Sequence, residues 1–208
     1  MGTNEIIRRR AALRSGGQSV DWESIARGMV DSTTQFSIPS ELAPLLSTSQ
    51  FMARTGLLSI EVPSGQTTIN NSCFHTCTRL TQVTLPNTIT TIGQRAFQYS
   101  GIIHLNFLPS SLVTIDSFGF YQCPSLEDAT IPSSVTTIGA QCFRYCSNLK
   151  EVIMESSTPP ALGSNTAFNN THASLVIYVP DASVNDYKTA NNWSDYATKI
   201  KGISERPT

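Results

Sequence analysis

Hydrophobic residues along this chain follow no steady period of 2 or 3.6, and recur instead in a block with a constant 23-residue period. Each block starts with a proline, and an isoleucine, a phenylalanine, a small residue and an aliphatic residue follow at fixed distances. Five columns hold their register over four copies: Pro63, Pro86, Pro109 and Pro132; Ile69, Ile92, Ile115 and Ile138; Phe74, Phe97, Phe120 and Phe143; Cys77, Ser100, Cys123 and Cys146; Leu80, Ile103, Leu126 and Leu149. This regularity predicts a repeat architecture in which each column becomes a ladder along the molecule.

An earlier, less regular copy precedes these four. It begins at Pro39, needs one residue more to reach its aromatic residue Phe51, and continues with Leu57 and Ile60. We therefore expect about five 23-residue coils over residues 36–154. One coil cannot enclose its own apolar side chains, so successive coils stack and share one core. The expected fold is an α/β solenoid of short strands and turns, with the phenylalanines in a single interior file.

Three local features fit such a coil. The proline fixes φ and ends the preceding strand. Gly93 and Gly139 follow the ladder isoleucine directly and are expected to permit a tight bend. The "AF" and "CF" segments are expected to form one helical turn with the phenylalanine pointing inward.

An open solenoid end exposes apolar surface and unpaired strand edges, so both ends need caps. At the N-terminal end, residues 19–35 contain "SVDWESIARGMVD", which predicts a short helix that faces the first coil. Residues 1–18, which lead into the flexible "SGGQS", are expected to form an arm outside the core.

The C-terminal cap is expected to cover residues 155–208. "LVIYVP" predicts a strand, and Asp181 is the expected N-cap of a short helix with Val184 and Tyr187 on one side. A second apolar stripe follows, formed by Trp193, Tyr196 and Ile200.

The consensus "IPSSVTTIG-x-x-x-F-x-x-C-x-x-L-x-x-V-x-I" resembles the BspA-like leucine-rich repeats, which are abundant in gut bacteria and their phages, over more than half of the chain. The ending "YVP…W-x-x-Y" is similar to the usual end of such arrays. The resemblance implies a leucine-rich-repeat solenoid and, for many relatives, an adhesin on the bacterial surface. The opening "SVDWESIARGMVD", followed by "FSIPS", resembles repeat proteins encoded in gut phage and prophage regions, which implies a virion component.

Composition narrows the function classes. The net charge of −1 does not favour nucleic-acid binding through bulk phosphate attraction. The chain has no run of about 18 apolar residues, so no membrane insertion is expected. The N-terminus lacks the apolar core of a signal peptide, so we expect no export through the Sec pathway.

Cysteine and histidine residues suggest a metal site at one point. "CFHTC" places Cys73, His75 and Cys77 in a row. However, both cysteines fall in columns of small residues, which indicates buried structural thiols. The odd total of five cysteines does not indicate a disulfide framework, so we expect reduced thiols and no metal.

Carboxylates offer the only other candidate chemistry. Glu127, Asp128 and Glu151 lie on neighbouring coils, and a paired-carboxylate glycosidase can be considered from them. Their positions in the coil face solvent, which favours an ordinary solvated surface. No nucleophile-elbow, phosphate-loop, dinucleotide or zinc-protease motif occurs. We therefore expect neither enzyme activity nor a cofactor.

Alternation along the sheet strands predicts which side chains a partner would meet. The expected contact residues form an outward ladder: Gln82, Thr84, Leu105, Phe107, Asp128, Thr130 and Glu151. Strict 23-residue register puts Leu105 and Phe107 on the surface as an apolar interface anchor. The alternative is a one-residue slip near Gly101, which turns both inward and Asn106 outward.

The N-terminal arm is the second contact candidate. It combines basic and apolar side chains: Ile6, Ile7, Arg8, Arg9, Arg10 and Arg14. One interpretation is a solvated, frayed terminus, and the other is an anchoring peptide that becomes ordered on a larger assembly.

The expected function is non-enzymatic recognition by a repeat scaffold. A phage virion protein of the fibre or decoration type, attached through its arm, fits the missing export signal and the basic arm together. The alternative is a bacterial cell-surface adhesin that binds a host protein or glycan. Expected partners are other proteins, with surface glycan as a further candidate and homo-oligomers allowed. An enzyme acting on surface glycans has the least support from the residues.

Overall fold

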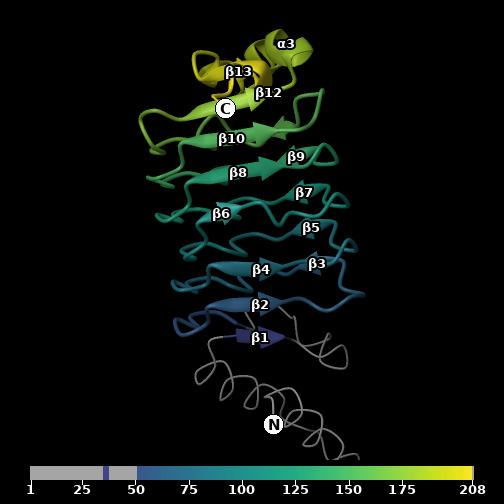
Figure 1. Ribbon diagram of the computed structural model, residues 1–208, viewed down its shortest axis with the longest axis vertical. Coiled ribbons are helices and arrows are strands. Elements are labelled where there is room, and N and C mark those ends of the chain that lie inside the picture. Colours follow the sequence, from purple (N-terminus) through teal and green to yellow (C-terminus); the bar gives the residue numbers. More distant parts are fainter. Residues whose placement is uncertain (1–34, 38–50, 208) are drawn as a thin grey trace, which may run out of the picture.

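The computed structural model describes residues 35–37 and 51–207, which form a stack of parallel coils (Figure 1). The expected arm at residues 1–18, and the expected helical cap at 19–35 apart from its last residue, lie outside the described residues. Most coils give one strand to each of two faces, and all strand pairs are parallel. The predicted solenoid is confirmed.

The first face carries the longer strands and divides into two sheets. The first sheet contains β1 (Gln35–Ser37), β2 (Ser59–Glu61) and β4 (Gln82–Thr84) in that order. The second contains β6 (His104–Leu105), β8 (Asp128–Ile131), β10 (Glu151–Met154), β12 (Val176–Val179) and β13 (Ile200–Gly202). Equivalent residues lie side by side, as Ala129 and Val152 do, so each column forms a ladder.

The second face consists of two-residue strands that form one continuous sheet. These are β3 (Thr68–Ile69), β5 (Thr91–Ile92), β7 (Thr114–Ile115), β9 (Thr137–Ile138) and β11 (Ala161–Leu162). In each strand the second residue is buried, so the two faces close over a shared core.

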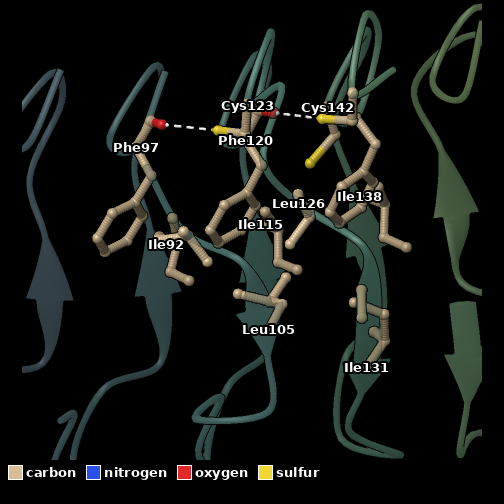
Figure 2. Packing of buried hydrophobic residues seen from close by; sticks show 14 of the residues in the cluster. Ile92, Phe97, Leu105, Ile115, Phe120, Cys123, Leu126, Ile131, Ile138 and Cys142 are labelled. Atoms are coloured by element: carbon tan, nitrogen blue, oxygen red, sulfur yellow. Dashed lines mark hydrogen bonds between the residues drawn. The ribbon is translucent and has the colours of Figure 1, made fainter. Parts of the chain in front are cut away.

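Phenylalanine rings fill the centre of this core as a single file. Neighbouring ring centroids are 5.2 to 5.6 Å apart and the ring planes differ by at most 21°, which is a stacked arrangement. Figure 2 shows two of the rings, Phe97 and Phe120, beside the isoleucine ladder. The file consists of Phe51, Phe74, Phe97, Phe120, Phe143 and Phe168, and all six are buried. The predicted interior file is confirmed.

The array continues beyond residue 154, where we expected it to end. Phe168 stacks on Phe143 at 5.3 Å, β11 pairs with β9, and β12 pairs with β10. The solenoid therefore has about six coils. The last coil does not keep the strict period, because Phe168 comes two positions later in the sequence than the period requires.

The segment that carries each phenylalanine is a run of turns, so the expected helical turn is wrong. In the four coils that carry Phe74, Phe97, Phe120 and Phe143, two non-glycine residues have positive φ, for example +58° at Arg95 and +59° at Tyr99. Amides between coils pair here as well, since the N–H of Phe97 donates to the carbonyl oxygen of Gly119 at 2.9 Å. The turns thus add a third line of hydrogen bonds along the stack.

Gly93 and Gly139 serve close packing rather than a bend. Neither has a positive φ. A Cβ atom on Gly93 would lie 2.9 Å from the backbone nitrogen of Asn71 and from the carbonyl oxygen of Ile69, both in the preceding coil. Glycine is required because two backbones approach closely.

The coil at residues 101–109 leaves the 23-residue register and recovers it. Leu105 pairs with Ala129, one position beyond the repeat period, whereas Ala129 pairs with Val152 at the period itself. The turn at Gly101 is one residue shorter than in the other coils, and the additional residue Leu108 restores the count before Pro109. β4 and β6 do not pair, so the first face is interrupted here.

The C-terminal cap closes the last coil with buried aromatic residues. It contains η2 (Asp181–Ser183), α3 (Val184–Thr189), η3 (Ser194–Tyr196), β13 and η4 (Ile203–Glu205). Tyr187, Trp193 and Tyr196 are buried as expected, and the Trp193 Nε1–H donates to the carbonyl oxygen of Pro160 at 2.8 Å. The expected N-cap at Asp181 is wrong, because Asp181 is the first residue of η2 and Ser183 holds the N-cap position of α3. Asp181 Oδ1 accepts from the N–H and the hydroxyl of Ser204.

Candidate functional site

The predicted outward ladder lies on the outer side of the first face, but in two separate groups. Gln82 and Thr84 are exposed on β4. Asp128 and Thr130 are half-buried on β8, and Glu151 lies beside Asp128 on β10. The interruption between β4 and β6 separates the two groups.

Leu105 and Phe107 are not surface anchors, which corrects the strict-register interpretation. Leu105 is fully buried opposite Ala129, and Asn106 is exposed. Phe107 is partly buried against the core and meets Phe97 edge-on, with 6.3 Å between centroids. The physical reason is the one-residue slip at Gly101, which inverts every side chain of the strand, and the slip is confirmed.

The carboxylates of the second group are already paired within the chain. His104 Nδ1 lies 2.6 Å from Asp128 Oδ2, and Arg206 Nη2 lies 2.7 Å from Glu151 Oε1. Arg206 Nε also donates to both oxygens of Glu151. Such surface pairs add little stability, but both carboxylates already have a partner within the chain, which weakens this face as an acidic docking surface.

The thiols serve the core. All five cysteines are buried, and none forms a disulfide bond. The Cys77 thiol donates to the carbonyl oxygen of Phe51 in the preceding coil at 3.1 Å, and Cys123 does the same with Phe97 (Figure 2). Burial raises the pKa of Cys77 to about 12 and raises that of Cys73 strongly. Within residues 35–37 and 51–207, no group of three or more His, Cys, Asp and Glu side chains could hold a metal ion.

A surface that the sequence did not reveal runs along the turns after the phenylalanines. We name it the aromatic ridge, and it consists of His75, Arg95, Tyr99, Phe118, Tyr121, Arg144 and Tyr145. Rings from successive coils meet edge to face: centroids are 5.5 Å apart for His75–Tyr99, 6.2 Å for Tyr99–Tyr121 and 5.6 Å for Tyr121–Tyr145. Tyr145 is 39% exposed and the other members are half-buried. The ridge thus crosses four coils on the outside of the molecule.

Two arginines lie on the rings of this ridge. The Arg95 guanidinium carbon is 4.7 Å from the centroid of Phe118, and that of Arg144 is 4.8 Å from the centroid of Tyr145. Both distances are typical of cation–π contacts. In the part of the chain that the structure describes, neither arginine has a carboxylate within ion-pair distance. Burial, and next the charge of Arg95, lower the pKa of His75 below its ordinary value of 6.5, so His75 is neutral near pH 7.

The ridge has no single column in the sequence because its aromatic residues alternate between two columns. Tyr121 follows its phenylalanine directly, whereas Tyr99 and Tyr145 come two residues after theirs. The signal that was present is an aromatic ring or imidazole at one of these two positions in four successive coils.

The candidate arm residues Ile6, Ile7, Arg8, Arg9, Arg10 and Arg14 lie outside the described residues. Among residues 35–37 and 51–207, no helix has the length and apolar character to cross a bilayer.

Known proteins share this architecture. A family model described as "BspA type Leucine rich repeat region" matches residues 45–181 in six copies. The structure resembles that of a leucine-rich repeat protein from Bacteroides ovatus, with a TM-score of 0.52 and 23% identity over 72% of this chain. It also resembles the pneumococcal vaccine antigen PcpA (TM-score 0.61, 17% identity, 82% of this chain) and a leucine-rich repeat protein of T. pallidum (TM-score 0.56, 23% identity, 81% of this chain).

These similarities concern the fold. The match spans 40% of the Bacteroides ovatus and pneumococcal chains and 85% of the T. pallidum chain. No curated protein matches the sequence significantly.

Proposed function

Because the chain belongs to the BspA-type leucine-rich repeat family, we propose that it is a non-enzymatic binding protein that holds a partner on the outer surface of its coils. The observation that carries this proposal is that inward and outward side chains of each coil have different roles. Inward side chains fill the shared core, and three lines of hydrogen bonds between coils hold the outward side chains at a fixed spacing. A rigid, extended surface of this kind is what solenoid proteins use for recognition.

The thiols and carboxylates that were considered for a metal site or for glycoside hydrolysis have surroundings that favour a binding protein over an enzyme. The thiols are buried, and Asp128 and Glu151 are paired with His104 and Arg206. Each is engaged in structure rather than poised for a reaction. The ridge, in contrast, carries aromatic rings and two arginines without carboxylate partners among the described residues.

Two locations fit such a protein: the bacterial cell surface and the phage particle. The similar structure of a vaccine antigen supports the cell surface, because antibodies must reach an antigen. The resemblance of the segment from residue 19 to phage-encoded repeat proteins supports a virion protein of the fibre or decoration type. Mass spectrometry of purified phage particles, alongside peptides shaved from intact cells, tests both. Recovery from only the cell interior would contradict display at either place.

Binding itself is tested with the full chain on two arrays, one of purified bacterial-surface and host proteins and one of glycans. We expect saturable binding to a protein. Labelled polysaccharide, incubated with the chain and followed by product analysis, tests for cleavage. The absence of saturable binding on both arrays, or the release of polysaccharide fragments, would contradict the proposal.

The arm is tested separately by deleting residues 1–18. If the arm anchors the protein, the truncated chain loses attachment to the particle or cell while its melting curve is unchanged. Equal attachment of the full and the truncated chain would show that residues 1–18 do not anchor the protein.

A further inference from the structure

We propose that the aromatic ridge is the contact site for a protein partner that presents aspartate or glutamate side chains. This inference rests on the proposed binding function and specifies where and what the chain binds. Its residues come from the turns of four coils rather than from the strands, so it is distinct from the outward ladder on the first face.

Charge is the first reason. Arg95 and Arg144 lie two coils apart, which is about 10 Å along the stack, and Tyr121 belongs to the coil between them. Neither of the two arginines has a carboxylate within ion-pair distance among the described residues. Asp116, an acidic residue of the same turns, accepts the N–H of Ser117 instead. Two guanidinium groups that have no carboxylate partner in the described part of the chain, and that are stacked on Phe118 and Tyr145, match a partner with at least two carboxylates. Arg144 is also held by hydrogen bonds that it donates to Gln141 Oε1 and to the Tyr145 hydroxyl.

Backbone conformation is the second reason. The position two residues after each phenylalanine has positive φ in every coil, +61° at Thr76, +52° at Gln122 and +57° at Asn170. Asparagine and glycine tolerate this conformation best. Tyr99 and Tyr145 occupy it with φ of +59° and +63°, a conformation that is strained for a bulky side chain. Tyr145 contacts Tyr121 and Arg144 within the chain, yet 39% of it stays exposed, so part of its ring is accessible to a partner.

Unmet hydrogen bonds point to the same segment. Arg144 Nε and Gln98 Oε1 are buried and have no hydrogen-bond partner within the described residues. A buried polar atom left unpaired costs free energy. Gln98 occupies the same coil position as Tyr121 and Arg144 of the ridge, so a partner that shifts these side chains can satisfy both atoms.

Ring orientation favours a protein over a glycan. Sugar rings stack on exposed aromatic faces, but the guanidinium groups of Arg95 and Arg144 already lie over Phe118 and Tyr145. Other rings meet at 77 to 89°, so the edge of one ring abuts the face of the next. The ridge therefore offers phenol hydroxyls and guanidinium groups rather than flat platforms. Tyrosine and arginine are the residues enriched at the centres of protein interfaces.

A random-peptide display library, selected on the immobilised full chain, provides the probe. We expect the enriched peptides to be rich in aspartate and glutamate and to bind more weakly as salt rises. In fluorescence anisotropy, Arg95→Ala, Arg144→Ala and Tyr145→Ala should each weaken the best peptide about tenfold. Lys150→Ala and Lys201→Ala each remove one exposed positive charge away from the ridge and should change affinity by less than about twofold. Melting curves confirm that the variants are folded.

Other outcomes overturn the inference without ambiguity. Peptides that bind the ridge variants as tightly as the parent chain place recognition elsewhere and leave the proposed binding function intact. Enriched peptides without acidic residues contradict the partner chemistry. If no peptide is enriched, while a glycan from the array binds and loses affinity in the ridge variants, the ridge is a carbohydrate site. If neither array nor library yields binding, the proposed function fails together with the inference.

Discussion

Replacing Phe120 by alanine tests the shared core at its centre. The ring is fully buried and stacks on Phe97 at 5.3 Å and on Phe143 at 5.6 Å. Truncating a buried phenylalanine costs about 3–5 kcal/mol through lost transfer free energy and the cavity left behind. Each lost aromatic pair is worth about 0.5–1.5 kcal/mol, although part of this is contained in the first figure. We therefore expect the free energy of unfolding to fall by about 4 kcal/mol, a large part of the about 5–15 kcal/mol that stabilises an ordinary domain.

Urea denaturation followed by circular dichroism measures this loss. The matched control is Phe118→Ala, because Phe118 belongs to the same coil but is half-buried on the ridge, and we expect it to lose less than about 1.5 kcal/mol. A loss below about 1 kcal/mol for Phe120→Ala, or equal losses in the two variants, would refute the reasoning.

Three further predictions follow from the register, the thiols and the ridge. Phe107→Ala should lower the free energy of unfolding by about 2–3 kcal/mol, since Phe107 packs against Phe97. The control Asn106→Ala changes an exposed residue and should alter that free energy by less than about 0.5 kcal/mol. A larger loss of thermal stability for Asn106→Ala than for Phe107→Ala would show that the strand keeps the strict 23-residue register. A thiol reagent should modify none of the cysteines in the folded chain and all five in denaturant, because every thiol is buried; rapid modification of the folded chain would contradict their placement. Since the folded pKa of His75 is depressed, the unfolded chain binds more protons below its ordinary value of 6.5, so stability should fall as pH drops from about 7 to about 5. His75→Gln should reduce that loss in denaturation curves taken across this range, and an equal loss in both chains would count against the depressed pKa.

The interior of this protein could be predicted from the sequence because large apolar residues at a fixed period have one physical explanation. Phe74, Phe97, Phe120 and Phe143 had to share an environment, and stacking is the arrangement that buries all of them. Where the period failed, the prediction failed with it. The two residues inserted before Phe168 hid the last coil, and the expected array ended too early.

Local geometry was harder to predict than the ladders. Gly93 follows a ladder isoleucine, which is compatible with both a bend and a close backbone approach, and only the position of the preceding coil distinguishes them. The slip at Gly101 was one of two interpretations. The burial of Leu105 decided it, because an apolar strand gains more from facing the core than from keeping the count.

The functional residues of the outer surface were the hardest to predict from the sequence. Core columns must repeat, whereas outward positions are free to vary, so function leaves no period there. Tyr99 and Tyr121 fall in different columns, and yet their ring centroids lie 6.2 Å apart. The turns contain residues with positive φ, and this backbone conformation brings both rings to the same side of the stack. The remaining residues of the expected ladder point outward, and a role for them in binding stays a prediction. They are Gln82, Thr84, Asp128, Thr130 and Glu151.

The arrangement of coils is tested most directly by nuclear Overhauser effects between phenylalanine rings in a chain labelled selectively at phenylalanine. Phe120 should show contacts to Phe97 and Phe143, each one repeat period away in sequence, at the centroid distances of 5.3 and 5.6 Å. Rings that contact solvent-exposed residues, or that show no contact with their counterparts in the neighbouring coils, would contradict the stacked core from which both binding proposals are drawn.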